Sequence, residues 1–156
     1  MSIEQADMLH GLSAADATRL TSLGSPVHVP SGAQLFALGS EAHGVYLIER
    51  GRMALTLPMR VGARQEDVLV EERTAGQMVG WSGLIPPHRF TLNASAQIDT
   101  DVLVLPRAPL LEFLDANPAI GYVVTRNLAS IVGQRLQVFQ AMWLREMQRF
   151  VESRSS

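Results

Sequence analysis

The chain has 156 residues, of which 47% are hydrophobic, and a formal net charge of −2. This size and composition suit one soluble domain with its own core. A slightly acidic chain lacks the concentrated positive charge of proteins that bind bulk nucleic acid, which argues against that class. The absence of cysteine also excludes disulfides, thiolate nucleophiles and cysteine-ligated metals.

The amino-terminal residues show no targeting signal. They have neither a basic start nor an unbroken apolar run, and no later stretch is long and apolar enough to span a bilayer. We therefore expect a cytoplasmic protein that is neither exported nor inserted in a membrane.

Residues 1–24 are expected to form a short helical lead-in. Apolar residues recur at helical spacing between Ile3 and Leu23. Ser13 precedes a run of helix-forming residues and is positioned as an N-cap.

Residues 25–106 have the pattern of a β domain. Short apolar runs alternate with turn residues, and no helical segment lies between them. This pattern predicts a mainly β fold, an antiparallel double-stranded β-helix or jelly roll, and not a parallel α/β sheet. The pair Arg50-Gly51 predicts a tight hairpin between its two flanking runs, because glycine supplies the positive φ of a two-residue turn. The expected strands are VHV, QLFAL, VYLIE, RMALTL, DVLVEE, RFTLNASA and DVLVL.

Residues 107–152 are expected to be helical. APLLEFLDA predicts a short helix, and Asn117 followed by Pro118 predicts the N-cap and first position of a second one. No proline interrupts the sequence from about residue 119 to 151, so this helix would be about 45–50 Å long. That length exceeds what a β domain of this size can cover.

The second half of the long helix carries an apolar stripe that needs a partner. Its members follow one another at intervals of three or four residues, which keeps them on one face. We expect this face to pair two copies in a homodimer, because a Trp and two Phe would otherwise form a large exposed apolar patch. The alternative is that the helix folds back on its own domain. The stripe consists of Val132, Leu136, Phe139, Trp143, Met147 and Phe150.

The long helix is also rich in arginine. A basic amphipathic helix could dock a partner protein or a membrane surface, of which the membrane is the less favoured. This composition supports a second hypothesis, a ligand-free interaction module. The basic residues are Arg126, Arg135, Arg145, Arg149 and Arg154, against Glu146 and Glu152.

Several segments together resemble the cyclic nucleotide-binding domain family, the effector part of catabolite-activator-type regulators and kinase regulatory subunits. They are VPSGAQLFALGSEAHGVYLIERGRMAL, GQMVG, DTDVLVLPRAPLLEFLDANP and RNLASIVGQRL, and the match as a whole spans roughly residues 12–136. The resemblance implies a jelly roll with a phosphate-binding cassette, here residues 76–96, and a terminal helix that closes over the ligand or pairs two subunits.

The cassette departs from the family pattern at two positions. Trp81 stands where the family has the glutamate that receives the ribose hydroxyl, and an indole cannot accept that bond. The family arginine lies six residues before an alanine matched by Ala96, which is the position of Phe90, whereas Arg89 lies one residue earlier. Neighbouring side chains of a strand point to opposite faces, so Arg89 would point away unless a bulge resets the register. These departures predict weak or no binding of cyclic AMP.

The groups that remain in the cassette suit a small anion or a nucleotide-like phosphorylated or carboxylated metabolite. In one account Trp81 is a wall of that site and Arg89 contacts the anion. In the other, Trp81 fills the cavity and Arg89 lies on the surface. The candidate ligand-binding residues are Gly80, Trp81, Ser82, Gly83, Leu84, Arg89 and Thr91.

No enzymatic site is predicted. The four histidines are scattered without the spacing of a cupin metal site, so we expect no metal and no cofactor. The adjacent carboxylates Glu71 and Glu72 fit an exposed strand end better than a catalytic pair. Few residues follow Phe150, so we expect no helix-turn-helix and no direct DNA binding. The prediction is a non-enzymatic ligand-sensing or regulatory module.

Overall fold

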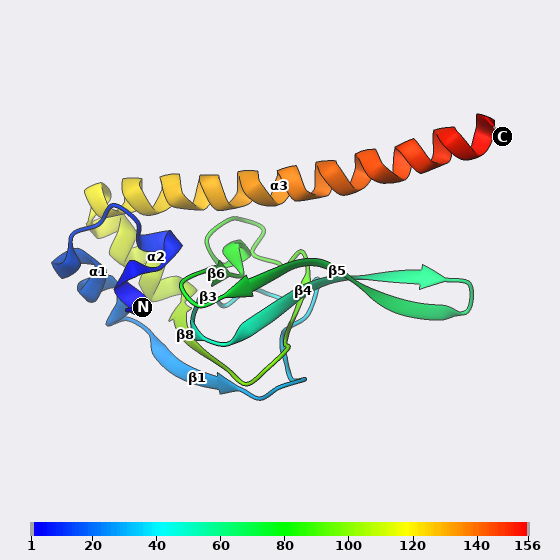
Figure 1. The fold of residues 1–156 in the computed structure, drawn as a ribbon. Helices are drawn as coiled ribbons and strands as arrows, with labels where there is room; N and C mark the ends of the chain where they lie inside the picture. Colours follow the sequence, from blue (N-terminus) through cyan, green and yellow to red (C-terminus); the bar gives the residue numbers. More distant parts are fainter. Residues whose placement is uncertain (1, 156) are drawn as a thin grey trace.

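The strand-forming residues fold into two antiparallel sheets that pack face to face, as the computed structural model of residues 2–155 shows (Figure 1). Each sheet has four strands. The predicted jelly roll is confirmed. The first sheet has the order β1 (Ser25–Val29), β8 (Thr100–Pro106), β3 (Gly44–Arg50) and β6 (Met78–Val79). The second has the order β2 (Gln34–Phe36), β7 (Asn93–Ala96), β4 (Arg52–Val61) and β5 (Arg64–Thr74).

Strand β3 is apolar on both faces because it lies between two cores. Its residues Val45 and Leu47 face a core that the helices cover, whereas Tyr46 and Ile48 face the core between the two sheets. A strand alternates its side chains between faces, so a continuous apolar run indicates a strand buried on both sides. The sheet that contains β3 is therefore the middle layer, between the second sheet and the helices.

The prediction of a hairpin at Arg50-Gly51 is wrong. Strand β3 pairs with β6 and β8, and β4 pairs with β5 and β7, so the chain passes from one sheet to the other at Gly51. The glycine does adopt a positive φ of 110°. A Cβ there would collide with the side chain and backbone of Thr100, so glycine is needed for a tight corner between the sheets.

The amino-terminal segment covers one end of the first sheet. It contains two 3-10 turns, η1 (Ile3–Gln5) and η2 (Asp7–Leu9), and the helix α1 (Ala14–Thr21). Ser13 is the N-cap of α1, as predicted: its side chain accepts a hydrogen bond of 3.1 Å from the Asp16 N–H. The helical pattern before Ser13 forms 3-10 turns instead of an α-helix, and it ends at Gly11, whose φ is 92°.

Two helices follow the β region, α2 (Arg107–Ala116) and α3 (Pro118–Ser155). Pro118 is the first residue of α3, as predicted, but the side chain of Asn117 does not cap that helix. Its amide instead donates to the Phe113 carbonyl at the end of α2, and its Oδ1 accepts from Arg19. Helix α3 has 38 residues and is about 57 Å long, longer than predicted because neither glycine nor proline follows Gly133.

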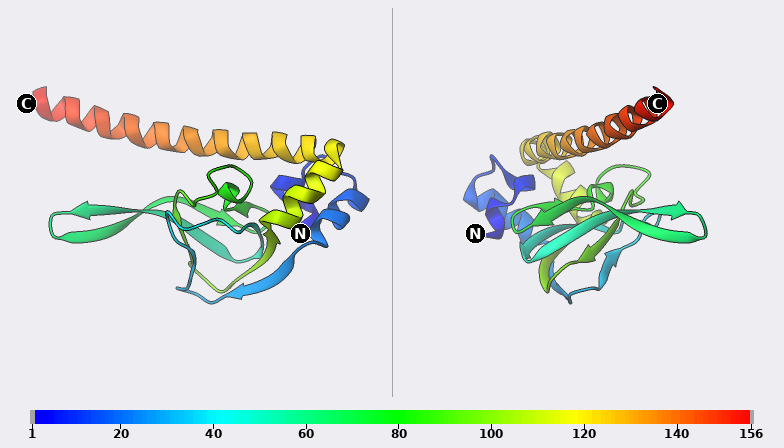
Figure 2. Two further views of the ribbon diagram at one scale, coloured as in Figure 1. Left: turned by 180° about the vertical axis from the view of Figure 1, so that it is seen from behind. Right: turned by 45° about the vertical axis from the view of Figure 1, so that its right-hand side comes forward.

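Helix α3 lies along the β-roll for its first part and projects beyond it at its carboxyl end (Figures 1 and 2). Val124, Leu128 and Ile131 are buried in the core beneath the helices. Further along, Val138 and Phe139 pack partly against the core between the sheets. From Trp143 onward the helix is exposed. Within residues 2–155, no helix is both long enough and apolar enough to cross a bilayer.

Candidate ligand site

The cassette begins with a tight glycine turn against β3. Gly80 has a left-handed backbone with φ of 80°, and the 3-10 turn η3 (Trp81–Gly83) follows it. Gly83 packs so closely on β3 that a Cβ would collide with the Gly44 carbonyl. The two glycines therefore hold Trp81 and Ser82 in a fixed position beside the sheet.

The cavity beside this turn is almost completely filled. Its volume is about 10 Å³, which is room for about one water molecule. Pockets that bind small molecules usually have about 300–1,000 Å³. In this conformation the cavity is therefore closed to a nucleotide. It is lined by Phe36, Leu55, Gly80, Trp81, Ser82, Phe90, Thr91, Leu92 and Arg135.

Aromatic rings fill the space beside the cassette. The rings of Phe36 and Phe90 are stacked, with centroids 3.8 Å apart and planes at 8°. Tyr46 lies against the same pair, 5.7 Å from Phe36. Stacked aromatics contribute stability beyond their buried area. Filling by these rings, together with the half-buried Trp81, accounts for the small volume.

The structure brings together four of the seven predicted site residues. Gly80, Trp81, Ser82 and Thr91 line the cavity, whereas Gly83, Leu84 and Arg89 do not. Leu84 packs instead in the core beneath the helices, at the edge of an apolar groove. The role of these residues in ligand binding stays a prediction.

Arg89 lies outside the cavity, on the surface. Its Nη1 donates a hydrogen bond of 3.0 Å to the Gly39 carbonyl, and its neighbour Phe90 is only 5% exposed and lines the cavity. The offset of one residue in the sequence is therefore real in the structure. The aromatic side chain takes the inward position, and the cation takes the outward one.

The cation at the cavity is Arg135 of α3, which the sequence analysis counted only among the residues that make the helix basic. Its side chain is only 9% exposed and lines the cavity. The spacing contained the signal: Arg135 follows the buried Leu128 and Ile131 by seven and four residues, which is the same helix face.

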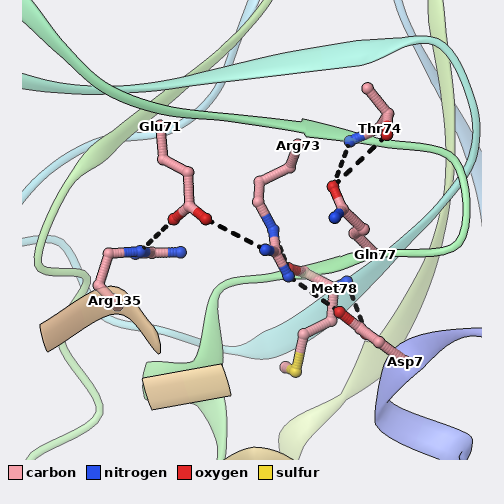
Figure 3. A network of polar contacts seen from close by, with 7 residues as sticks. All are labelled: Asp7, Glu71, Arg73, Thr74, Gln77, Met78 and Arg135. Atoms are coloured by element: carbon pink, nitrogen blue, oxygen red, sulfur yellow. Dashed lines mark hydrogen bonds and ion pairs between the residues drawn. The ribbon is translucent and has the colours of Figure 1, made fainter. Parts of the chain in front are cut away.

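Arg135 belongs to a chain of ion pairs that joins three parts of the fold (Figure 3). Its Nε donates to Glu71 of β5 at 2.5 Å, and the other oxygen of Glu71 accepts from Arg73 at 3.2 Å. Arg73 also donates to Asp7 of η2 at 2.9 Å. Glu71 is thus a bridge between two arginines, which corrects its interpretation as an exposed strand end.

Burial acts on both ends of this network. It raises the pKa of the Asp7 carboxyl, although Arg73 and the Met78 N–H oppose the shift. Burial also lowers the pKa of the Arg135 guanidinium, against the attraction of Glu71. Both shifts have the sign expected when a charged group leaves water. In this network, burial disfavours the charged forms of Asp7 and Arg135, and the ion-pair partner of each favours them.

A second hollow beside α3 is apolar. It has a volume of about 440 Å³ and lies between α2, α3 and the cassette. At Val132 it meets the exposed part of the predicted stripe, where Leu136 is 57% and Trp143 61% exposed. Phe139 does not belong to this exposed face, since it packs partly on the sheet core. The groove is lined by Leu84, Ile85, Leu111, Leu114, Thr125, Leu128, Ala129, Val132 and Gly133.

No metal centre is found in the part of the chain that the structure describes. Residues 2–155 contain no group of three or more histidine or acidic side chains placed to hold an ion. The chemistry that these residues offer is therefore that of an arginine, a few small polar groups and aromatic walls.

We expect the substitution Arg89→Ala to leave the free energy of unfolding within about 1 kcal/mol of the parent value. The side chain is exposed and makes one hydrogen bond, to the Gly39 carbonyl. Urea unfolding would measure the change, with Thr91→Ala as a neighbouring exposed control. A loss of several kcal/mol would show that Arg89 supports the cassette from outside.

Comparison with known proteins agrees with this architecture. A sequence profile described as Cyclic nucleotide-binding domain matches residues 26–117, which is more than half of the chain. No curated protein matches the chain in sequence.

Solved structures show the same fold. The catabolite activator protein of Thermus thermophilus is 23% identical with a TM-score of 0.74, and the match covers 96% of this chain and 66% of that one. The N-terminal domain of a transcriptional regulator from Streptomyces coelicolor A3(2) is 17% identical with a TM-score of 0.71, over 88% and 95% of the two chains. A cyclic nucleotide-binding domain from Methylobacillus flagellatus KT is 20% identical with a TM-score of 0.68, over 97% and 79%. The chain belongs to the cyclic nucleotide-binding domain family and is a regulatory module of that type.

Proposed function

We propose that this module works as a homodimer through α3 and senses a small anionic ligand at the cassette cavity. The proposal rests on one observation: within a single turn, α3 contributes to both the cassette cavity and the exposed apolar face. Arg135 lines the cavity, and the next residue, Leu136, is 57% exposed on the apolar face. A ligand that displaces α3 at Arg135 must therefore also displace the face at which two copies would meet.

The filled cavity supports a small anion over a cyclic nucleotide. Because only about 10 Å³ is free, any ligand has to open the site, and a small ligand needs the least opening. The ribose would also meet the Trp81 indole in place of a carboxylate. The chemistry is binding without catalysis, and the effect on the partner helix is the output.

A second candidate is a ligand-free interaction module that acts only through α3. The closed cavity favours it, because the aromatic rings occupy the space that a ligand would need. In that account, the cassette is part of the core and the apolar face of α3 is the functional surface.

Calorimetry with the purified chain separates the two candidates. We expect cyclic AMP to bind more weakly than micromolar, that is, less favourably than about −8 kcal/mol. We expect inorganic phosphate to raise the melting temperature, since a ligand at about 100 times its Kd stabilises a fold by about 2.7 kcal/mol. Sodium chloride at equal ionic strength is the control. A dimer that shows no phosphate-dependent shift would favour the interaction module, and micromolar binding of cyclic AMP would contradict the choice of ligand.

A further inference from the structure

We propose that Arg135 is the residue that receives the anionic group of the ligand, and that the ligand takes the place of Glu71 as its partner. This inference rests on the proposed ligand-sensing function and assigns its binding residue. It moves the anion contact from the cassette loop, where Arg89 would lie, to helix α3.

Arg135 has unused donors at the cavity. Its Nε is bound to Glu71, whereas Nη1 and Nη2 donate no hydrogen bond to any residue in the range 2–155. A guanidinium has five N–H donors in a planar fork, which suits two oxygens of a phosphate or carboxylate. The side chain is 9% exposed, yet these Nη atoms are not sealed from solvent. A small anion that opens the cavity can therefore contact them.

Glu71 can release Arg135 without becoming an unpaired buried charge. Its other oxygen stays 3.2 Å from Nη1 of Arg73. Arg73 is in turn held by Asp7 at 2.9 Å and by the Met78 carbonyl at 3.3 Å. Removing one partner of a buried ion pair is costly when the other charge is left alone. Because this network retains the pair Glu71–Arg73 (Figure 3), the exchange at Arg135 avoids that cost.

The exchange has a direct consequence for α3. The ion pair with Glu71 ties α3 to β5, and a ligand bound to Nη1 and Nη2 would tie the helix to the cassette instead. The resident ion pair also keeps the site closed in the absence of ligand, since the guanidinium forms part of the cavity wall. Glu71 occupies Nε of the same guanidinium and carries the same negative charge as the ligand, so the two anions repel each other and Glu71 competes with the ligand.

The test removes the charge from each member of the ion pair in turn. Calorimetry on the full chain measures the binding of inorganic phosphate, which is the probe. Glu71→Gln removes the competitor and is expected to tighten phosphate binding by about tenfold. Arg135→Gln removes the receiving group and is expected to weaken binding by about ten- to a hundredfold. Arg145→Gln, which removes the same charge from an exposed position of α3, is the control and is expected to leave the affinity unchanged.

A purely structural ion pair predicts that both variants lose stability and change affinity in the same direction, and that result would overturn the inference. If the parent binds phosphate and Arg135→Gln binds it equally well, the inference fails while the sensing function stands. If neither the parent nor Glu71→Gln binds phosphate, both fail. Circular dichroism checks that each variant is folded. If Arg135→Gln does not fold, Glu71→Gln decides alone, because unchanged or weaker binding there contradicts competition.

Discussion

Trp143→Glu is expected to convert the proposed homodimer into a monomer, with a rise of at least about a hundredfold in the dissociation constant. Trp143 is 61% exposed. Leu136, at 57%, and Phe150, at 55%, are exposed on the same side of α3. Exposed faces of this kind mark protein interfaces in soluble proteins, and tryptophan is among the residues that contribute most to them. A charge at the centre of such a face would lose its hydration on association.

Sedimentation equilibrium measures the dissociation constant. Because Trp143 is exposed in the single chain, the substitution should leave the thermal stability of the monomer unchanged. Gln137→Glu is the matched control, since it adds the same charge at another exposed position of α3. A parent chain that is monomeric at about 100 µM would contradict the proposed dimer. So would a Trp143→Glu variant that dimerises as tightly as the parent, or a control that dissociates equally.

The fold could be predicted from the sequence because its signals are local. Ser13 caps α1 through its own side chain, Pro118 begins α3, and short apolar runs become strands. Such features depend on neighbours a few residues away. The failure at Gly51 shows the limit: the positive φ was correct, but the choice between a hairpin and a corner depends on Thr100, about fifty positions later.

The site could be predicted only in part, since its geometry depends on distant contacts. The offset between Arg89 and Phe90 was visible in the sequence, and the structure confirms which side chain points inward. The sequence analysis did not predict that Arg135 supplies the cation at the cavity. A helix periodicity shows that Arg135 shares a face with Ile131, but only the packing of α3 on the roll shows that this face closes the cassette.

Phe90→Ala is expected to lower the free energy of unfolding by about 3–5 kcal/mol, which is the usual cost of removing a buried phenylalanine. The ring is 5% exposed and stacks on Phe36 at 3.8 Å. Its removal leaves a hole between the sheets where the cavity now has about 10 Å³. The backbone bonds of residue 90 to Ser40 and Gly39 remain, so the loss belongs to the side chain. Against a typical total of about 5–15 kcal/mol, this is a large fraction.

Urea unfolding followed by the fluorescence of Trp81 measures this loss, in a Trp143→Phe background so that Trp81 is the single reporter. Thr91→Ala is the control, because its side chain is exposed and the change should stay within about 0.5 kcal/mol. A loss below about 1 kcal/mol for Phe90→Ala would mean that the ring is loosely packed in solution. The cassette would then be more open than the cavity volume indicates, and the steric argument against a cyclic nucleotide would fail, leaving only the chemical argument from Trp81 and Arg89.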